Sequence, residues 1–261
     1  MSPYFIDEPA VISFSGGRTS AYMLYKVLEA HGGTLPDHIK VCFANTGKEM
    51  PETLDFVRDC GEQWGVEIVW LEFNGTKENP VVVGHDSASR KGEPFDLLTT
   101  QKNYLPNMVA RFCTSELKVI PILKHFGDLA QVVGIRADEP RRVAKQRGKE
   151  GYILPLADAR VSRQDIHEFW LKQNFNLNLP MVDGRTDWGN CDLCFLKGGA
   201  IKQSIIIKRP ELSDWWIEQE AKISARFRSD QPSYEQMKMI ATDQGQLFDF
   251  DDESIPCFCG D

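Results

Sequence analysis

Short apolar runs alternate with amphipathic segments over the first 156 residues of the chain. Alternation of this kind is typical of βαβ units, in which a mostly parallel sheet is covered by helices. The apolar runs predict strands at 10–14, 38–44, 66–71, 130–135 and 152–156. Helical spacing predicts helices at 19–30, 51–64, 105–110 and 116–126, and the polar stretch 74–99 predicts a long loop. We therefore expect an α/β fold with a doubly wound sheet and helices on both faces.

The last hundred residues follow a different pattern, without strands. Amphipathic spacing predicts helices at 163–174, 197–207, 212–224 and 234–242, with a cysteine-containing turn at 190–196. An acidic tail follows from residue 245. We accordingly divide the chain into a nucleotide-binding α/β domain, residues 1–160, and a helical, cysteine-containing region, residues 161–261, packed on it.

Composition narrows the class of protein. The 261 residues are 42% hydrophobic and carry a net charge of −8, which are ordinary values for a globular chain that is not basic all over. No apolar run has the length of a membrane span, and the first residues lack a signal-peptide pattern. We expect a cytoplasmic protein with no membrane partner, whose seven cysteines serve metal binding or redox chemistry rather than disulfides.

The most informative segment is the turn between the first predicted strand and the first predicted helix. It reads Ser15-Gly16-Gly17-Arg18-Thr19-Ser20. A strand that ends at glycines and restarts as a helix leaves backbone N–H groups free at the helix N-terminus, where the helix dipole also favours an anion. The glycines allow a close approach of the backbone, and the serine hydroxyls add donors. The segment predicts a phosphate-binding loop, the alternative being a plain glycine turn.

Three further segments carry candidate site residues, and each falls near a strand end or a helix start. The second predicted strand ends in Asn45-Thr46-Gly47, and the fourth ends in Gly134-Ile135-Arg136, followed closely by Arg141 and Arg142. The third segment runs from Arg111 through Cys113 and Lys118 to Pro121. Arginine at the mouth of a sheet suits sulfate or phosphate, because the guanidinium fork binds oxyanions through two N–H groups.

The cysteines fall into two sets. Cys42 and Cys60 lie within predicted core elements and are interpreted as small apolar side chains. The others lie in turns or at element ends, and Cys191-Asp192-Leu193-Cys194 has the spacing of two thiolates on one metal or of a redox dithiol. Iron–sulfur and zinc both suit such thiolates, so the metal remains open at this point.

Taken together, these motifs resemble those of the PAPS/APS reductase family within the PP-loop adenine-nucleotide α-hydrolase-like superfamily. The resemblance implies an oxidoreductase that acts on a sulfated adenine nucleotide, PAPS or APS. It implies nucleotide contacts from the phosphate loop and the strand ends, by Ser15, Gly16, Gly17, Arg18, Thr19, Ser20, Asn45, Thr46, Gly47, Lys118, Gly134, Arg136, Arg141 and Arg142. This chain has Asn45 where the family usually has aspartate.

The resemblance also implies a cofactor and catalytic residues. In iron–sulfur members of the family, a cysteine before the Lys-x-x-Pro element joins a downstream Cys-x-x-Cys around one [4Fe–4S] cluster. Here Cys113, Cys191 and Cys194 match those ligands, and Cys257 is the candidate for the fourth. Cys259-Gly260 is similar to the family's C-terminal nucleophile element, so Cys259 and Arg136 are the candidate catalytic residues. A thioredoxin-like protein is the implied partner that releases sulfite.

Two alternatives remain open. The first is an ATP-pyrophosphatase-type sulfurtransferase, which would use ATP with Mg²⁺, take sulfur from a partner such as a cysteine desulfurase, and thiolate a small molecule or a nucleic acid. The second is a nucleotide-binding partner in a larger modification or defence system. The sequence leaves the oligomeric state open, with a dimer as one alternative.

Overall fold

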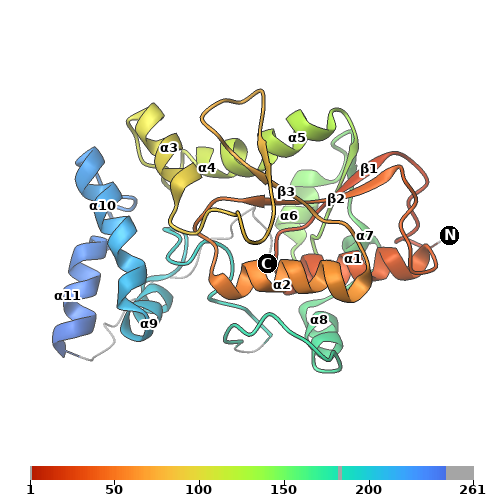
Figure 1. The fold of residues 1–261 in the computed structure, drawn as a ribbon. Helices are drawn as coiled ribbons and strands as arrows, with labels where there is room; N and C mark the ends of the chain where they lie inside the picture. Colours follow the sequence, from red (N-terminus) through yellow and green to blue (C-terminus); the bar gives the residue numbers. More distant parts are fainter. Residues whose placement is uncertain (1, 182–183, 245–261) are drawn as a thin grey trace.

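The computed structural model describes residues 2–181 and 184–244, and these are built around a single six-stranded sheet (Figure 1). The strand order is β4-β3-β2-β1-β5-β6, and every neighbouring pair is parallel except β3 and β4. The strands are β1 Ala10–Ser13, β2 Ile39–Asn45, β3 Val69–Glu72, β4 Val81–Val83, β5 Ala130–Val133 and β6 Tyr152–Ile153.

Helices connect the strands and continue beyond them. The first half contains α1 Arg18–Ala30, α2 Pro51–Trp64, α3 Glu93–Lys102, α4 Phe112–Thr114, η1 Ser115–Val119 and α5 Ile120–Phe126. The second half contains α6 Pro140–Gln146, α7 Pro155–Asp158, α8 Arg163–Trp170, α9 Gly199–Lys208, η2 Pro210–Leu212, α10 Ser213–Ile223 and α11 Tyr234–Gln244. The consecutive segments α4, η1 and α5 form one helical stretch that contains a π-helical turn at η1.

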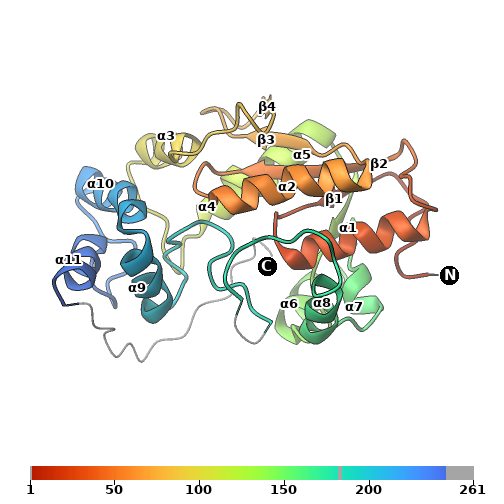
Figure 2. The same cartoon turned by 60° about the horizontal axis from the view of Figure 1, so that its bottom comes forward.

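The sheet is buried on both faces, because successive side chains of a strand point to opposite sides. Ile12 belongs to the large core that includes residues of α1 and α2. Its neighbour Val11 packs with Cys42 and Leu71 against Ile122 of α5. Figures 1 and 2 show α1 and α2 on one side of the sheet and α5 on the other. The predicted doubly wound α/β fold is confirmed.

The strand order creates a crevice beside β1. The chain runs outward from β1 through β2 to β3, and it later returns to place β5 on the other side of β1. At such a switch point the connections leave in opposite directions and open a gap at the carboxyl ends of the two central strands, where ligands of open α/β sheets bind. Ser13 at the end of β1 pairs with Val133 at the end of β5, so both strands finish at this crevice.

Two local predictions were wrong. The stretch 74–99 was predicted as a loop but contains β4 and most of α3; β4 is a three-residue edge strand, too short to leave an alternating pattern. The stretch 105–110 was predicted as a helix but is irregular. There the Asn107 side chain accepts hydrogen bonds from the backbone N–H groups of Val109 and Ala110, which gives the backbone an alternative to helix formation.

The helices α9, α10 and α11 pack around aromatic side chains. Trp216 of α10 stacks on Tyr234 of α11, with 5.2 Å between ring centroids, and both rings contact Phe227. The same large core includes residues of α1 and α2, so apolar packing is continuous from these helices to the sheet. A division of the chain near residue 160 stays a prediction. Among the helices of the described ranges, none combines the length and apolarity that crossing a membrane requires.

Candidate nucleotide site and cysteine turn

The predicted phosphate loop joins β1 to α1 at the crevice. Gly16 has φ = +78°, and a Cβ atom there would lie 2.7 Å from Cγ2 of Thr53, so only glycine fits without strain. The Ser15 backbone N–H donates to Oγ of Ser20, 3.2 Å away, and the two hydroxyls lie 2.9 Å apart. Ser20 in turn donates to the carbonyl of Gly17. These bonds hold the loop in shape ahead of any ligand.

A cavity of about 710 Å³ opens beside this loop. Its lining includes Ser13, Ser15, Ser20 and Gly134, which places it over the carboxyl ends of β1 and β5. The volume lies within the range usual for sites that bind small molecules and cofactors. We call it the larger cavity.

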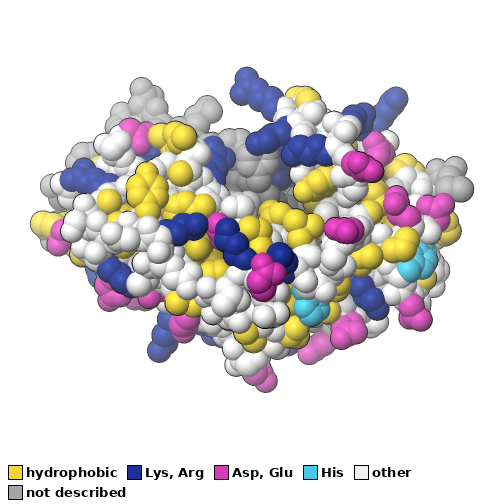
Figure 3. All heavy atoms as spheres, turned by 90° about the horizontal axis from the view of Figure 1, so that it is seen from above, with side chains coloured by type: hydrophobic (Ala, Val, Ile, Leu, Met, Phe, Trp, Pro, Cys, Tyr) yellow, Lys and Arg dark blue, Asp and Glu magenta, His cyan; other side chains and the backbone are white. Residues whose placement is uncertain are grey.

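The charged residues that line the larger cavity are all basic. Five basic residues line it and no acidic residue does; they are Arg111, Lys118, Arg142, Lys145 and Lys149. Figure 3 shows lysine and arginine side chains around the hollow in the face seen there. A positive site in a chain of net charge −8 indicates an anionic ligand, because low-dielectric walls concentrate the field of the cations.

The candidate nucleotide-binding residues divide between two cavities. Ser15, Ser20, Lys118, Gly134 and Arg142 line the larger cavity. A smaller cavity of about 420 Å³ is lined by others of the set, namely Arg18, Thr19, Arg136, Arg141 and again Arg142. Gly16, Gly17, Asn45, Thr46 and Gly47 are in neither lining. The structure thus brings the loop and the end of β5 together, and of the end of β2 only Ala44 lines the larger cavity.

The Arg18 side chain is held in place by hydrogen bonds to other parts of the protein. Its buried guanidinium group donates to Oδ1 of Asn176 at 2.7 Å, to Oγ1 of Thr186 at 2.5 Å and to the carbonyl of Leu179 at 3.2 Å. Burial lowers the pKa of Arg18 to about 10, which still leaves it charged at neutral pH. The side chain therefore fastens Asn176, Leu179 and Thr186 to the start of α1.

Arg136 connects the end of β5 to the same helix start. Its Nε donates to Oδ1 of Asp138 at 2.8 Å, and its Nη1 donates to Oγ1 of Thr19 at 3.3 Å. The residue is buried, with an exposed fraction of 5%. Arg136 consequently reaches the smaller cavity from a position fixed by its neighbours.

The end of β2 is held by buried polar contacts. The Asn45 amide donates to Oε1 of Glu72 at 2.5 Å and to the carbonyl of Ser89 at 2.9 Å. Its own Oδ1 accepts from the Gly47 backbone N–H. All the polar atoms of this side chain have protein partners, so the structure shows Asn45 shaping the loop after β2.

Thr46 links this loop to the cysteines. Its hydroxyl donates to Oε2 of Glu49 at 2.9 Å and lies 3.5 Å from Sγ of Cys191. The other carboxylate oxygen of Glu49 is 3.3 Å from Nζ of Lys118, which lines the larger cavity. A chain of polar contacts therefore runs from the larger cavity to the Cys191 thiol.

The Cys191–Cys194 turn is anchored by the residue between the two thiols. Asp192 is buried, and its carboxylate lies 2.8 Å from Nζ of Lys48 and accepts from the Trp216 indole N–H at 2.7 Å. Its backbone N–H donates to the carbonyl of Lys48 at 2.7 Å. Burial raises the pKa of Asp192, while Lys48 acts in the opposite direction. The turn is thus tied to the loop after β2.

The predicted cluster ligands are only partly covered by the described residues. Cys191 and Cys194 are buried at one turn, and Cys113 is half-buried at the start of the α4–α5 stretch. Within residues 2–181 and 184–244, no three His, Cys, Asp or Glu side chains are placed to hold a metal ion. Cys257 and Cys259 lie outside the described residues. Two thiols on one turn fit half of a four-thiolate site, so the cluster stays a prediction.

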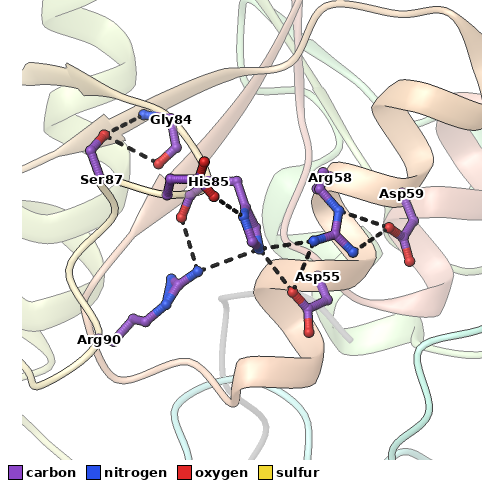
Figure 4. Close-up of polar contacts among 8 residues, drawn as sticks. Asp55, Arg58, Asp59, Gly84, His85, Ser87 and Arg90 are labelled. Atoms are coloured by element: carbon purple, nitrogen blue, oxygen red, sulfur yellow. Dashed lines mark hydrogen bonds and ion pairs between the residues drawn. The ribbon is translucent and has the colours of Figure 1, made fainter.

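The remaining cysteines and His85 have other roles. Cys42 and Cys60 are fully buried, and burial raises the pKa of both thiols, as expected of core side chains. The His85 ring lies 2.8 Å from Oδ1 of Asp55 on α2, and Arg90 donates to the His85 carbonyl at 2.9 Å (Figure 4). His85 lines neither cavity, and it ties the loop after β4 to α2.

Three basic residues of the larger cavity were not among the predicted site residues. Arg111, Lys145 and Lys149 come from the turn before α4 and from the end of α6 and beyond. Arg142 and Lys145 are three residues apart on α6, a spacing that places two side chains on one helix face. This spacing in the sequence could have indicated that the two residues share a helix face. Helix α6 itself was not predicted, so this shared basic face was not predicted either.

Comparison with known proteins agrees with this architecture. Residues 9–179 match the family model of the phosphoadenosine phosphosulfate reductase domain. The chain is 32% identical over 204 residues to an uncharacterized nin region protein of Escherichia phage lambda, which covers 72% of this chain and 66% of that protein. It is 30% identical over 149 residues to an uncharacterized protein of Methanocaldococcus jannaschii, covering 54% of this chain and 26% of that protein.

The family match covers well over half of the chain and includes the phosphate loop, the arginines after β5 and Cys113. The chain therefore belongs to the phosphoadenosine phosphosulfate reductase domain family, a family of nucleotide-binding PP-loop proteins. The matches span just under two thirds of the phage protein and about a quarter of the archaeal one.

Proposed function

We propose that this chain is an oxidoreductase that binds a sulfated adenine nucleotide in the larger cavity and reduces its sulfate. The observation that carries the proposal is the charge of that cavity, which has five basic residues and no acidic residue beside the phosphate loop. A sulfated nucleotide carries its charge on several oxyanion groups, and such groups match arginine and lysine donors. A lining without carboxylates favours direct neutralisation of the ligand by these cations.

The apolar part of the same lining suits the nucleoside. Phe14, Ala44 and Ile135 line the cavity together with the serines of the loop. A site of this kind, with apolar walls and a few converging polar groups, is the usual environment of a cofactor-sized ligand. In the proposed orientation the adenosine contacts the apolar wall, and the phosphate and sulfate contact Lys118, Arg142 and the loop.

The proposed reaction balances with a dithiol as reductant. The Cys259 thiolate forms a bond to the sulfate sulfur, and the bond between that sulfur and the bridging phosphate oxygen breaks. The nucleotide phosphate leaves with the bond's electron pair, and Arg142 and Lys118 offset its charge. A dithiol, such as a thioredoxin-like protein, then attacks the cysteine S-sulfonate, releases sulfite and becomes a disulfide.

The proposed cofactor is a [4Fe–4S] cluster held by Cys113, Cys191, Cys194 and Cys257, with zinc as the competing metal. Such a cluster would supply a thiolate-ligated, redox-active iron centre. The chain's own residues prepare the turn for it: Asp192 and Lys48 fix the Cys191–Cys194 turn, and Thr46 contacts the Cys191 thiol.

Product analysis tests this function. The purified chain is incubated anaerobically with PAPS, APS or ATP and a dithiol, and sulfite and pyrophosphate are both measured. We expect sulfite from PAPS or APS, and its loss in the Cys259→Ser variant. Sulfite that persists in Cys259→Ser would remove Cys259 from the mechanism. Pyrophosphate from ATP, without sulfite from either sulfated nucleotide, would replace the reductase by an ATP-pyrophosphatase-type sulfurtransferase.

A further inference from the structure

The smaller cavity adjoins the larger one but is built from different segments. Its wall comes from the start of α1, the turn from β5 into α6, the start of α8 and residues 184–197. Arg142 lines both cavities, so they are neighbours on either side of this side chain. Apart from Arg142, the two linings share no residue. A ligand in the larger cavity therefore leaves most of the smaller cavity accessible.

The smaller cavity has more positive than negative side chains. Seven basic residues and three acidic residues line it. The acidic ones are already engaged by the wall itself: Asp138 accepts from Arg136 Nε and from the Arg163 backbone N–H, at 2.8 and 3.0 Å. Glu139 is paired with Arg142, and Asp187 lies 4.0 Å from Arg185. An excess of positive charge remains for a ligand.

Specific N–H groups in this wall have no acceptor. Within residues 2–181 and 184–244, the guanidinium groups of Arg141 and Arg163 make no hydrogen bond or ion pair with protein. Nε of Arg142 is buried, and it too has no hydrogen-bond partner among those residues. Arg141 is exposed and Arg163 partly exposed, so water can reach their donors, whereas the buried Nε of Arg142 is a donor that is costly to leave unpaired. Guanidinium groups that converge on one space bind an oxyanion well, through paired N–H groups.

The wall also contains apolar side chains. Ile166, Leu196 and Ile201 line the cavity, and Cys194 is also in the lining. A volume of about 420 Å³ holds more than an inorganic ion. The cavity combines an oxyanion subsite with room for a small organic group.

We propose that the smaller cavity is a second ligand site, which takes a small organic molecule with a terminal tetrahedral oxyanion while the nucleotide occupies the larger cavity. This goes beyond the proposed function, which needs only the nucleotide and a dithiol. Arg142 would contact both ligands, and it would place the oxyanion of one beside the phosphates of the other.

Equilibrium dialysis of the full chain with radiolabelled inorganic sulfate tests the site. The protein is first saturated with adenosine 3′,5′-bisphosphate, so that the larger cavity is filled. We expect one sulfate to bind per chain, and we expect Arg163→Gln to weaken this binding about tenfold, the effect of losing one charge-assisted hydrogen bond. The nucleotide affinity should change less than twofold. Arg147→Gln, an exposed arginine outside both linings, is the matched control.

The outcomes separate this site from the nucleotide site. Absence of bound sulfate in the nucleotide-saturated protein would mean that a single ligand spans both cavities and would overturn the proposal. Sulfate binding that is equal in Arg163→Gln and wild type would also overturn it. If Arg163→Gln folds poorly by circular dichroism, Arg141→Gln provides the same test. Failure of the nucleotide itself to bind would count against the proposed function. In that case, sulfate binding to the nucleotide-free chain, compared between wild type and Arg163→Gln, would still test the smaller cavity.

Discussion

Lys48 and Asp192 form a buried ion pair that joins the loop after β2 to the cysteine turn, with 2.8 Å between Nζ and Oδ2. Their side chains have exposed fractions of only 6% and 4%. Nζ of Lys48 also lies 5.1 Å from the ring centroid of Trp215, and the Asp192 carboxylate accepts from Trp216. The pair therefore connects the sheet, the turn with Cys191 and Cys194, and helix α10.

Breaking this pair should destabilise the protein strongly. Lys48→Met leaves the Asp192 carboxylate buried without its cation, and we expect a loss of about 3–5 kcal/mol in the free energy of unfolding, measured by urea denaturation. Adding Asp192→Asn removes the uncompensated charge and keeps an acceptor for Trp216, so the double variant should be more stable than Lys48→Met alone. A single variant as stable as wild type would show that the pair does not hold the turn.

The start of α8 should show a pH-dependent contribution to stability. Ser162 and Asp165 form a capping box, in which the Ser162 backbone N–H donates to Asp165 at 2.7 Å. Hydrogen bonds from Ser162 lower the pKa of Asp165 below 3.8. A carboxyl group with a lowered pKa stabilises the fold above its unfolded pKa, and this stabilisation is lost as the pH falls through the folded pKa.

We therefore expect Asp165→Asn to cost up to about 1 kcal/mol at pH 6, the usual size of a helix cap. The difference from wild type should begin to shrink below about pH 4, the ordinary pKa of an aspartate, and should disappear once the pH falls below the lowered pKa of the folded Asp165. Chemical denaturation at pH 6 and at a pH below about 4 measures this difference in the free energy of unfolding between the variant and wild type. A difference that stays constant between the two pH values would mean that the Asp165 charge makes no contribution.

The two glycines of the phosphate loop should respond differently to substitution. Gly17 has φ = −98° at the start of α1, a backbone conformation that other residues adopt, so Gly17→Val should fold. Its side chain would block a phosphate from the backbone N–H groups, and we expect nucleotide affinity to fall at least about tenfold by calorimetry. Gly16→Ala should instead lower stability, because of the positive φ and the contact with Thr53. Unchanged nucleotide affinity in Gly17→Val would contradict the phosphate-loop assignment.

The cysteine turn should determine the metal content of the protein. Anaerobically purified wild type is expected to be brown, with a broad absorbance near roughly 400 nm from thiolate-to-iron charge transfer. Cys191→Ser and Cys194→Ser should lose it, whereas Cys60→Ala, in the apolar core, should keep it. A colourless preparation with stoichiometric zinc would reject the iron–sulfur cluster, and a metal-free one would favour a dithiol role.

The sheet was predictable because its signals are local. Strands β1, β2 and β5 are apolar runs whose ends coincide with turn residues, and α2 begins at Pro51 and ends before Gly65, as the sequence indicates. Strand β4 and helix α3 were missed because an edge strand of three residues and a helix of weak amphipathicity leave little pattern. Their positions depend on pairing with β3 and on packing against distant residues.

The site was predictable only in part, for a similar reason. The loop from Ser15 to Ser20 is contiguous, so its chemistry is visible in the sequence. The division of the arginines between two cavities depends on side-chain direction: Arg141 and Arg142 are adjacent in sequence, yet only Arg142 reaches the larger cavity. Asn45 stays a predicted nucleotide contact; its hydrogen bonds to Glu72 and Ser89, 27 and 44 residues further along the chain, could not be seen in the sequence.

Nucleotide binding by a variant of the larger cavity tests the proposed nucleotide site most directly. Lys145 lines that cavity, and Arg147, two residues away, lies outside it and pairs with Asp158 on the surface. In calorimetric titrations with PAPS, we expect Lys145→Gln to bind about tenfold more weakly than wild type, because one of the five cations that line the cavity is lost. Arg147→Gln should bind as wild type does. Equal PAPS affinity in wild type and Lys145→Gln would contradict the placement of the nucleotide in the larger cavity.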